Sequence, residues 1–449
     1  MNKWLTVAVL SLGLTLAHAA DTDGAQSNPA LAQAQKADAV AKASGFKIRP
    51  VDDAWRAALP RDATLATQAY LDRLPAEAVK KSDAYFEGGY WLQLADLIVG
   101  LAIAALMLSG RRAARVRDWA ARVGRGPLRR DALFGGVYVV AAWVLALPLT
   151  IYASFIREQN YGMSTQTFPA WFGEQLLMLG INALIFALVA AVLYAVIRRV
   201  GPRWWIWGTV LGIGFMALLI ALTPVYIAPL FNTSKPLDDG PVKAAVLQMA
   251  HANGVPVDNV YEVDASRQTT RVSANVSGLF GTAAVRLNDN LLRRTSLPEI
   301  RAVMGHELGH YVMNHIPKLL IALTLILLSG FYVAQWAMQG LLARFAASTG
   351  VSRIDDVANL PMLVAVFTLF FTLLTPIQNT LIRTNEIEAD RFSLNLAREP
   401  HGFAEAQLHL IEYRKSNPSD LEEFLFFDHP APRKRIYDAM RWREAMGTP

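Results

Sequence analysis

Cysteine is absent from all 449 residues, and charged residues are scarce. Without cysteine the chain has no disulfides, thiolate metal ligands or cysteine nucleophile, so histidine and carboxylate side chains remain as its metal ligands. Charged residues make up 18% of the chain, whereas an ordinary soluble protein has about 25%. Hydrophobic residues make up 53%. This composition is typical of a membrane protein.

The net charge of +6 does not indicate a nucleic-acid partner, because the positive excess is concentrated beside apolar segments. Eight arginines lie between residues 111 and 130, and three more between 198 and 203. Positively charged loops stay on the cytoplasmic side of a membrane. We therefore expect a protein of the bacterial inner membrane, with residues 232–317 and the C-terminal tail on the periplasmic side.

Six apolar runs approach or exceed the roughly 20 residues that cross a bilayer. They lie near residues 90–109, 133–155, 175–197, 204–230, 319–343 and 361–382. Several carry Trp or Tyr at their ends, as interfacial anchors do. The sequence predicts a mainly α, polytopic membrane barrel or bundle of six to seven spans with a small α/β domain.

The N-terminal 20 residues have a basic start, a short apolar core and an A-x-A exit, which indicate a secretory signal peptide cut after Ala19. The alternative is an uncleaved first membrane helix. Residues 21–89 are polar and favour helix by propensity, so we expect an exported, partly flexible helical lead-in. Membrane helices are expected in 90–231 and 318–382.

Residues 232–317 have the pattern of an α/β insertion. Helical spacing covers 241–253, and strands are expected at 259–264 and 283–287. A further helix begins near Pro298, and we expect Pro317 to kink or end it. The tail from 383 to 449 is again helical and polar, and forms the C-terminal part of the same domain.

The most informative motif is His306-Glu307-Leu308-Gly309-His310, an H-E-x-x-H pattern on that helix. Residues i and i+4 share one helix face, so the two histidines can bind one Zn²⁺ while Glu307 points at a water molecule. The alternative is that the two histidines and the glutamate lie on an ordinary solvent-exposed helix face and bind no metal. The motif alone does not decide between these two interpretations, so the residues around it must.

Catalytic zinc takes three protein ligands and leaves one position open. Just beyond the last apolar run, Glu386 and Asp390 share a helix face, whereas Glu388 points away from Glu386. Glu386 is the best candidate for the third ligand, and Asp390 can accept a hydrogen bond from a ligand histidine. The alternative is a charged helix cap at a membrane surface.

Several blocks of the chain resemble the type I CAAX prenyl endopeptidases, integral-membrane gluzincin metallopeptidases. The blocks are Gly305–His310, Glu386-x-x-Ala389-Asp390, Ser273-Ala274-Asn275 with Gly278-Leu-Phe280 and Val285-Arg-Leu287, Tyr226-Ile-Ala-Pro229-Leu-Phe231, and His429-Pro430. The resemblance covers roughly residues 80–445. It implies that His306, His310 and Glu386 bind one zinc ion per chain and that Glu307 is the general base in peptide hydrolysis.

The same resemblance implies further substrate contacts. Asn275, or Ser273 in the other register, would touch the substrate backbone beside an edge strand near Val285 and Leu287, which receives the peptide by β-addition. An ordinary polar residue at a strand end is the alternative. His429 would stabilise the oxyanion, although a histidine before proline alone is more often a loop residue. His315, expected on the motif helix, is interpreted as structural.

The family likeness also implies a ring of seven membrane helices around a water-filled chamber, whereas this chain offers six spans plus the signal-like N-terminus. The expected partners are a membrane-associated polypeptide substrate and the lipid bilayer, with no nucleic acid. One competing function is a non-catalytic membrane chaperone or assembly factor with structural zinc, but a structural site needs no general base such as Glu307. A transporter is another, but the apolar runs hold few ionisable residues.

Overall fold

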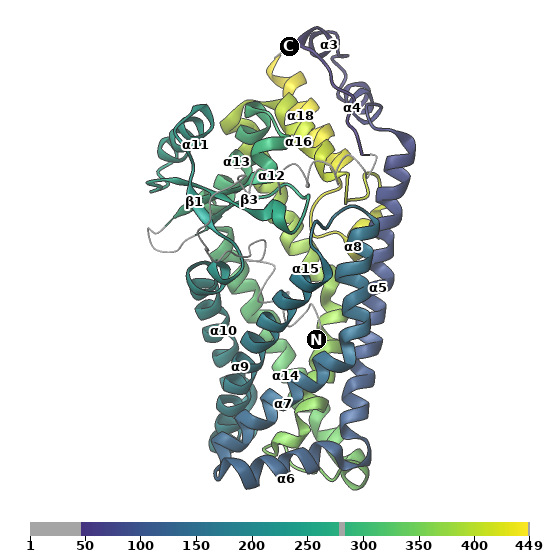
Figure 1. Cartoon of the computed structure of the whole chain (residues 1–449), viewed down its shortest axis with the longest axis vertical. Helices are drawn as coiled ribbons and strands as arrows, with labels where there is room; N and C mark the ends of the chain where they lie inside the picture. Colours follow the sequence, from purple (N-terminus) through teal and green to yellow (C-terminus); the bar gives the residue numbers. More distant parts are fainter. Residues whose placement is uncertain (1–45, 278–282, 448–449) are drawn as a thin grey trace.

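The structure is a computed structural model that describes residues 46–277 and 283–447. The expected signal segment at 1–20 and the expected turn at Gly278-Leu279-Phe280 lie outside the described residues. Two parts are distinct in Figure 1: long helices below, and above them a smaller part that contains the sheet. The chain is mainly helical, as predicted.

Five helical segments are long and apolar enough to cross a membrane. They span Ala76–Gly124, Pro127–Asn160, Phe168–Leu230, His315–Thr349 and Val357–Ala397. Their main helices are α5 (Ala76–Leu108), α7 (Pro127–Ile151), α9 (Phe168–Val200), α10 (Trp204–Leu222), α14 (His315–Thr349) and α15 (Leu360–Ala397). The chain is therefore a multi-pass membrane protein.

The third apolar segment contains two helices. The short η3 turn, Gly201–Arg203, separates α9 from α10, and Gly201 has a φ of 58°, which favours glycine. The two helices pack against each other and lie side by side in Figure 1. All six predicted runs fall in these helical segments, and the count of six to seven spans stays a prediction.

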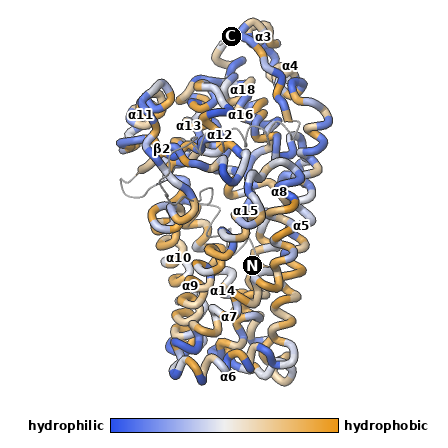
Figure 2. Tube along the Cα trace, viewed as in Figure 1, coloured by the Kyte–Doolittle hydropathy of each residue, from blue (hydrophilic) through white to orange (hydrophobic). Residues whose placement is uncertain are grey.

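Apolar side chains face outward along the long helices, as expected in lipid. Trp91, Leu184, Trp336 and Leu373 have exposed fractions of 73%, 64%, 74% and 70%. Figure 2 shows this hydrophobic middle with hydrophilic residues at both ends. Helix α6 (Arg112–Gly124) lies across the lower end in Figure 1 and carries four of the eight clustered arginines, so positive charge marks the end opposite the sheet.

Short helical pieces complete the membrane part. They are η1 (Ser109–Arg111), the π-helices η2 (Tyr152–Ile156) and η4 (Thr223–Ile227), α8 (Arg157–Asn160), η5 (Ala228–Leu230) and η7 (Val357–Asn359). Pro224 lies inside η4. Since proline removes a backbone donor, it favours this local departure from α-helical bonding at the end of a span.

A four-stranded sheet lies above the membrane part, in the order β1-β2-β4-β3. Its strands are β1 (Ser234–Pro236), β2 (Val260–Val263), β3 (Ala274–Ser277) and β4 (Ala284–Asn288). β2 and β4 are parallel, and the two outer pairings are antiparallel. The predicted strands at 259–264 and 283–287 are confirmed as β2 and β4, whereas β1 and β3 were not predicted.

The order of strands corrects the expected position of the sheet edge. β4 carries Val285 and Leu287, but it lies between β2 and β3, and both side chains are fully buried. The prediction that this strand receives a peptide at an open edge is wrong, because its backbone groups already pair on both sides. The free edge on this side of the sheet belongs to β3.

Helices pack around the sheet and extend away from it. They are α11 (Pro241–Ala252), η6 (Ala265–Arg267), α12 (Asp289–Arg294), α13 (Leu297–Val312), α16 (Pro400–Leu410), α17 (Asp420–Phe426) and α18 (Pro432–Met446). The helix predicted at 241–253 is confirmed as α11. α13 ends at Val312, and Asn314, in the left-handed region with a φ of 55°, separates it from α14. Pro317 therefore lies in the first turn of α14 and does not end the motif helix.

The segment before the first span packs against the C-terminal helices. α3 (Asp53–Ala57) and α4 (Ala63–Leu71) are its two short helices, and α4 contacts α18. The buried Tyr70 side chain shares a core with Phe403 and Met440, and its hydroxyl lies 2.6 Å from His401 Nδ1. The described part of the predicted lead-in is thus helical, and it packs against the C-terminal helices.

Candidate metal centre

Two glycines allow the motif helix α13 to approach the end of α15 closely. A Cβ on Gly305 would lie 3.1 Å from the Cα of Ser393, and one on Gly309 would lie 3.2 Å from the Cα of Ala389. The Ser393 hydroxyl also donates to the carbonyl of Ala302. Because the two helix backbones nearly touch, side chains from H-E-x-x-H meet side chains from residues 386–390.

The start of α13 is fixed by its own sequence. Ser296 and Glu299 form a capping box, in which each side chain bonds the backbone of the other residue. Glu299 also lies 3.1 Å from His409 Nε2 on α16. The N-terminus of α13 is thereby held against α16, and the histidines two turns later are held in place with it.

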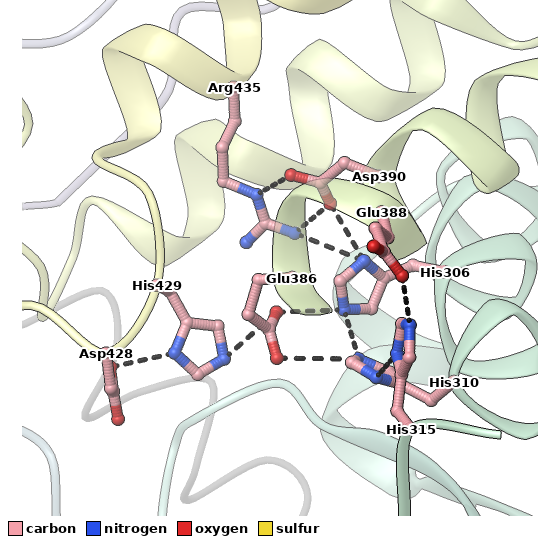
Figure 3. Close-up of polar contacts among 9 residues, drawn as sticks. All are labelled: His306, His310, His315, Glu386, Glu388, Asp390, Asp428, His429 and Arg435. Carbon is pink, nitrogen blue, oxygen red and sulfur yellow. Dashed lines mark hydrogen bonds and ion pairs between the residues drawn. The ribbon is translucent and has the colours of Figure 1, made fainter. Parts of the chain in front are cut away.

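Three potential ligand groups converge between these helices. His306, His310 and Glu386 each offer one atom, and these atoms lie within 4.8 Å of one another. His306 Nε2 is 3.1 Å from His310 Nε2 and 3.1 Å from Glu386 Oε2, while His310 Nε2 is 3.4 Å from Glu386 Oε1. Figure 3 shows the three side chains pointing at one another.

The donor set fits a cation. His306 Nδ1 is 2.8 Å from Asp390 Oδ1, and an ionised carboxylate there accepts a hydrogen bond from Nδ1–H, which leaves Nε2 of the neutral ring as a lone-pair acceptor. Nε2 then faces other acceptor atoms, and the buried Glu386 Oε2 has no hydrogen-bond partner among the described residues. Burial also lowers the pKa of His310 to about 3, so this ring is neutral. Converging acceptors of this kind need a positive charge between them.

Asp390 and Arg435 form a buried support behind His306. Arg435 Nε donates to Asp390 Oδ2 at 2.8 Å, and its Nη2 donates to the other oxygen. Both side chains are about 95% buried, with exposed fractions of 4% and 5%. Sequence reasoning proposed the Asp390 contact but missed Arg435, which comes from α18. A single sequence carries no pattern that pairs Arg435 with Asp390, which lies 45 residues earlier.

A second chain of contacts supports His310. His310 Nδ1 is 2.8 Å from His315 Nδ1, His315 Nε2 is 3.1 Å from Glu388 Oε2, and Lys318 Nζ reaches the same oxygen at 2.9 Å. The prediction that His315 belongs to the motif helix is wrong, since it is the first residue of α14. Glu388 points away from Glu386, as predicted, and its partner is this histidine (Figure 3).

Glu307 faces a cavity of 740 Å³ that His306, His429 and Arg435 also line. Burial raises the pKa of the Glu307 carboxyl to about 7. The cavity continues to the upper end of α9, where Trp171 and Glu174 line it. A carboxylate beside the metal-binding group, in a cavity of this size, can exchange a proton with a bound reactant.

His429 lies on the other side of Glu386 from His306. Its Nε2 is 3.3 Å from Glu386 Oε2, and its Nδ1 is 2.8 Å from Asp428 Oδ1 (Figure 3). It is not one of the three converging groups. The Asp428 contact orients the ring, so that Nε2 points at the centre and at the cavity.

The remaining predicted residues lie on or near the sheet. Ser273 lines the cavity just before β3. Asn275 lies on edge strand β3, where it pairs in register with Arg286 of β4. The buried Oδ1 of Asn275 has no hydrogen-bond partner in the described part of the chain. Val285 and Leu287 are buried on β4 and do not face the cavity opening. The edge of β3, rather than β4, lies near the metal-binding group.

Two family profiles match the chain in succession. One, described as CAAX prenyl protease N-terminal with five membrane helices, matches residues 59–233. The other, peptidase family M48, matches residues 236–443 and so includes the whole metal-binding group. The first match ends just before β1, and the second begins at the end of β1 and includes the later membrane helices α14 and α15.

Individual proteins are similar over most of the chain. A Bacillus subtilis protein named uncharacterized metalloprotease YhfN is 29% identical over 323 residues, which are 71% of this chain and 76% of the relative. CAAX prenyl protease 1 of Saccharomyces cerevisiae is 27% identical over 324 residues, 68% and 70% of the two chains. The crystal structure of Saccharomyces mikatae Ste24p has the same fold, with a TM-score of 0.70, 19% identity and coverage of 98% and 99%.

Proposed function

Because the chain belongs to peptidase family M48, together with the CAAX prenyl proteases, we propose that it uses zinc to hydrolyse peptide bonds. Homology to these relatives makes it a membrane metalloendopeptidase with a peptide substrate. The observation that carries the zinc assignment is the convergence of His306, His310 and Glu386, with one imidazole oriented by Asp390. Two histidines and a glutamate are a ligand set of catalytic zinc proteases.

Zinc held by these ligands supplies Lewis acidity, which makes water nucleophilic near neutral pH and polarises the scissile carbonyl. Glu307 removes the proton from the attacking water and passes it to the leaving amine. The water therefore gains a bond to the carbonyl carbon as the amine leaves with a proton. Burial suits Glu307 to this exchange, because a base with a pKa near 7 both accepts and releases protons at neutral pH.

His429 is placed to stabilise the developing oxyanion. Its Nε2 points toward the centre, and Asp428 accepts a hydrogen bond from its Nδ1. An N–H at this Nε2 would donate a hydrogen bond to negative charge at the centre. A fixed donor needs no reorganisation during the reaction.

The peptide is proposed to bind along the edge of β3. The residues that lead into this strand line the cavity with Glu307, and the unpaired Asn275 oxygen can accept a backbone N–H from a substrate. Ser273 lies beside the same path. This assignment moves the β-addition edge from β4 to β3 and keeps Asn275 as the residue that contacts the peptide backbone.

We assign six spans to the membrane part by counting α9 and α10 as separate helices of one apolar segment. The arginine-rich end at α6 is proposed to face the cytoplasm of a bacterium, so the metal centre faces the periplasm. Because the cavity extends to the top of α9, substrates are polypeptides at the membrane surface. C-terminal CAAX-like sequences are one class, and damaged membrane proteins are another.

The proposal is tested by metal analysis and peptide cleavage on the purified full-length protein in detergent. Wild type should hold one zinc per chain and cleave unstructured peptides, and chelation should abolish cleavage until zinc is restored. His306→Ala should lose both zinc and cleavage. Full cleavage by a zinc-free His306→Ala protein would contradict the assignment.

A further inference from the structure

Arg414 lies in the loop between α16 and α17, at the boundary between two cavities. It lines the 740 Å³ cavity that contains Glu307 and also a second cavity of 520 Å³. The second cavity lies among α5, α14 and α15, where Tyr90 and Leu323 line it. A substrate that reached from the first cavity into the second would lie beside this side chain.

The other arginines that line these cavities have carboxylate partners. Arg271 Nη2 donates to Glu158 Oε2 at 2.6 Å, Arg435 pairs with Asp390, and Arg157 lies 3.8 Å from Glu158. Arg414, by contrast, makes no hydrogen bond and no ion pair within 4 Å among the described residues. Its charge acts on Asp428, whose carboxylate bonds His429.

The residues on both sides of Arg414 are held by their own contacts. Glu412 accepts from Arg294 at 2.8 Å, the Tyr413 ring lies 5.3 Å from the guanidinium of Arg271, and Lys415 pairs with Glu87 at 2.6 Å. The backbone at Arg414 is therefore fixed. A positioned guanidinium that lines a cavity and has no hydrogen-bonded partner among the described residues is suited to bind a planar oxyanion.

We propose that Arg414 binds a carboxylate of the peptide substrate and selects for peptides that carry one. The inference rests on the proposed peptidase function and adds a substrate preference to it. The carboxylate is either the C-terminal group of the peptide or an Asp or Glu side chain. Both present the same two oxygens to the guanidinium, so peptide variants must distinguish them.

The test compares cleavage of a neutral ten-residue peptide as its C-terminal acid and as its C-terminal amide. Wild type should prefer the acid roughly 10-fold to 100-fold in kcat/KM, since a charge-assisted hydrogen bond has this effect. Arg414→Gln should reduce the acid-to-amide ratio to about one, and Arg414→Lys should restore part of it. Arg441→Gln, which removes an exposed arginine on α18, is the matched control and should keep the wild-type ratio.

A series of amide peptides with one Asp at each of the last four positions identifies the source of the carboxylate. If an internal Asp restores cleavage in wild type but not in Arg414→Gln, the ligand is a side chain. If only the C-terminal acid depends on Arg414, the ligand is the terminal carboxylate. Either result supports the proposal, whereas equal ratios in wild type and Arg414→Gln for every peptide would overturn it.

Binding separates this inference from the proposed function. In a zinc-loaded Glu307→Gln protein, fluorescence anisotropy of labelled acid and amide peptides reports affinity without cleavage. The acid should bind roughly 10-fold to 100-fold more tightly, and adding Arg414→Gln should remove the difference. No cleavage by wild type together with this Arg414-dependent binding would contradict only the peptidase assignment. Equal binding of the acid, the amide and the Asp-containing amide peptides would overturn the carboxylate site.

Discussion

Asp390 Oδ1 lies 2.8 Å from His306 Nδ1, and the opposite side of the same carboxylate is held by Arg435. The contact fixes both the orientation and the tautomer of the imidazole, because the ionised carboxylate accepts a hydrogen bond from Nδ1–H. His306 therefore presents an unprotonated Nε2 to the metal without any rearrangement.

Asp390→Asn should weaken metal binding, because the amide no longer carries the charge that orients His306. Loss of such an outer contact reduces metal affinity by about 10-fold to 100-fold. Competition with a zinc indicator measures the affinity. Glu399→Gln, at a half-exposed pair with Arg301, is the control and should bind zinc as wild type does. Wild-type affinity in Asp390→Asn would show that the contact is not needed.

His315→Ala should also weaken metal binding, because it breaks the chain from His310 to Glu388. The expected loss is smaller than for Asp390→Asn, since His315 acts through a neutral ring rather than a buried carboxylate. Glu388→Gln, which leaves His315 in place, should reduce the affinity less than His315→Ala does. The same zinc competition gives all three values, and a larger loss in Glu388→Gln than in His315→Ala would contradict this order.

Gly305→Ala should separate α13 from α15. The added Cβ would lie 3.1 Å from the Cα of Ser393, so the backbones must move apart, at a cost of about 1–3 kcal/mol. Gly180→Ala on α9 is the matched control, since nothing lies within 4 Å of its Cβ and alanine favours helix. Thermal unfolding should show a lower Tm for Gly305→Ala alone, together with lower zinc content. Equal Tm values would exclude this role for the glycine.

The orientation predicts that alkaline phosphatase fused after Arg443 is active, because the C-terminal helices lie on the same side as the metal centre. A fusion after Arg203, at the arginine-rich end, should be inactive. Activity assays with immunoblots that confirm expression distinguish the two cases. An inactive but stable fusion after Arg443 would place the centre in the cytoplasm.

The parts of the site that lie close together in sequence were predictable. His306 and His310 are one helical turn apart, as are Glu386 and Asp390, so the 3.6-residue period identifies their shared faces. The long apolar runs likewise predicted the membrane helices. These features depend on local spacing, which a single sequence carries in full.

Contacts between distant segments were not predictable in the same way. Arg435 reaches Asp390 from another helix, and His315 reaches His310 only because α13 ends at Val312 and α14 starts anew. Pro317 suggested a later break, whereas the left-handed Asn314 provides the actual one. Strand β3 was not predicted, and without it the sheet edge was assigned to β4 in error.

The central claim is that Glu307 transfers protons beside a zinc ion that other residues hold. Zinc content and peptide cleavage measured on the same preparation of Glu307→Gln test it most directly. We predict one zinc per chain, as in wild type, with cleavage reduced by about 10²-fold to 10⁴-fold, because the amide cannot accept a proton. Cleavage at the wild-type rate by zinc-loaded Glu307→Gln would contradict the account.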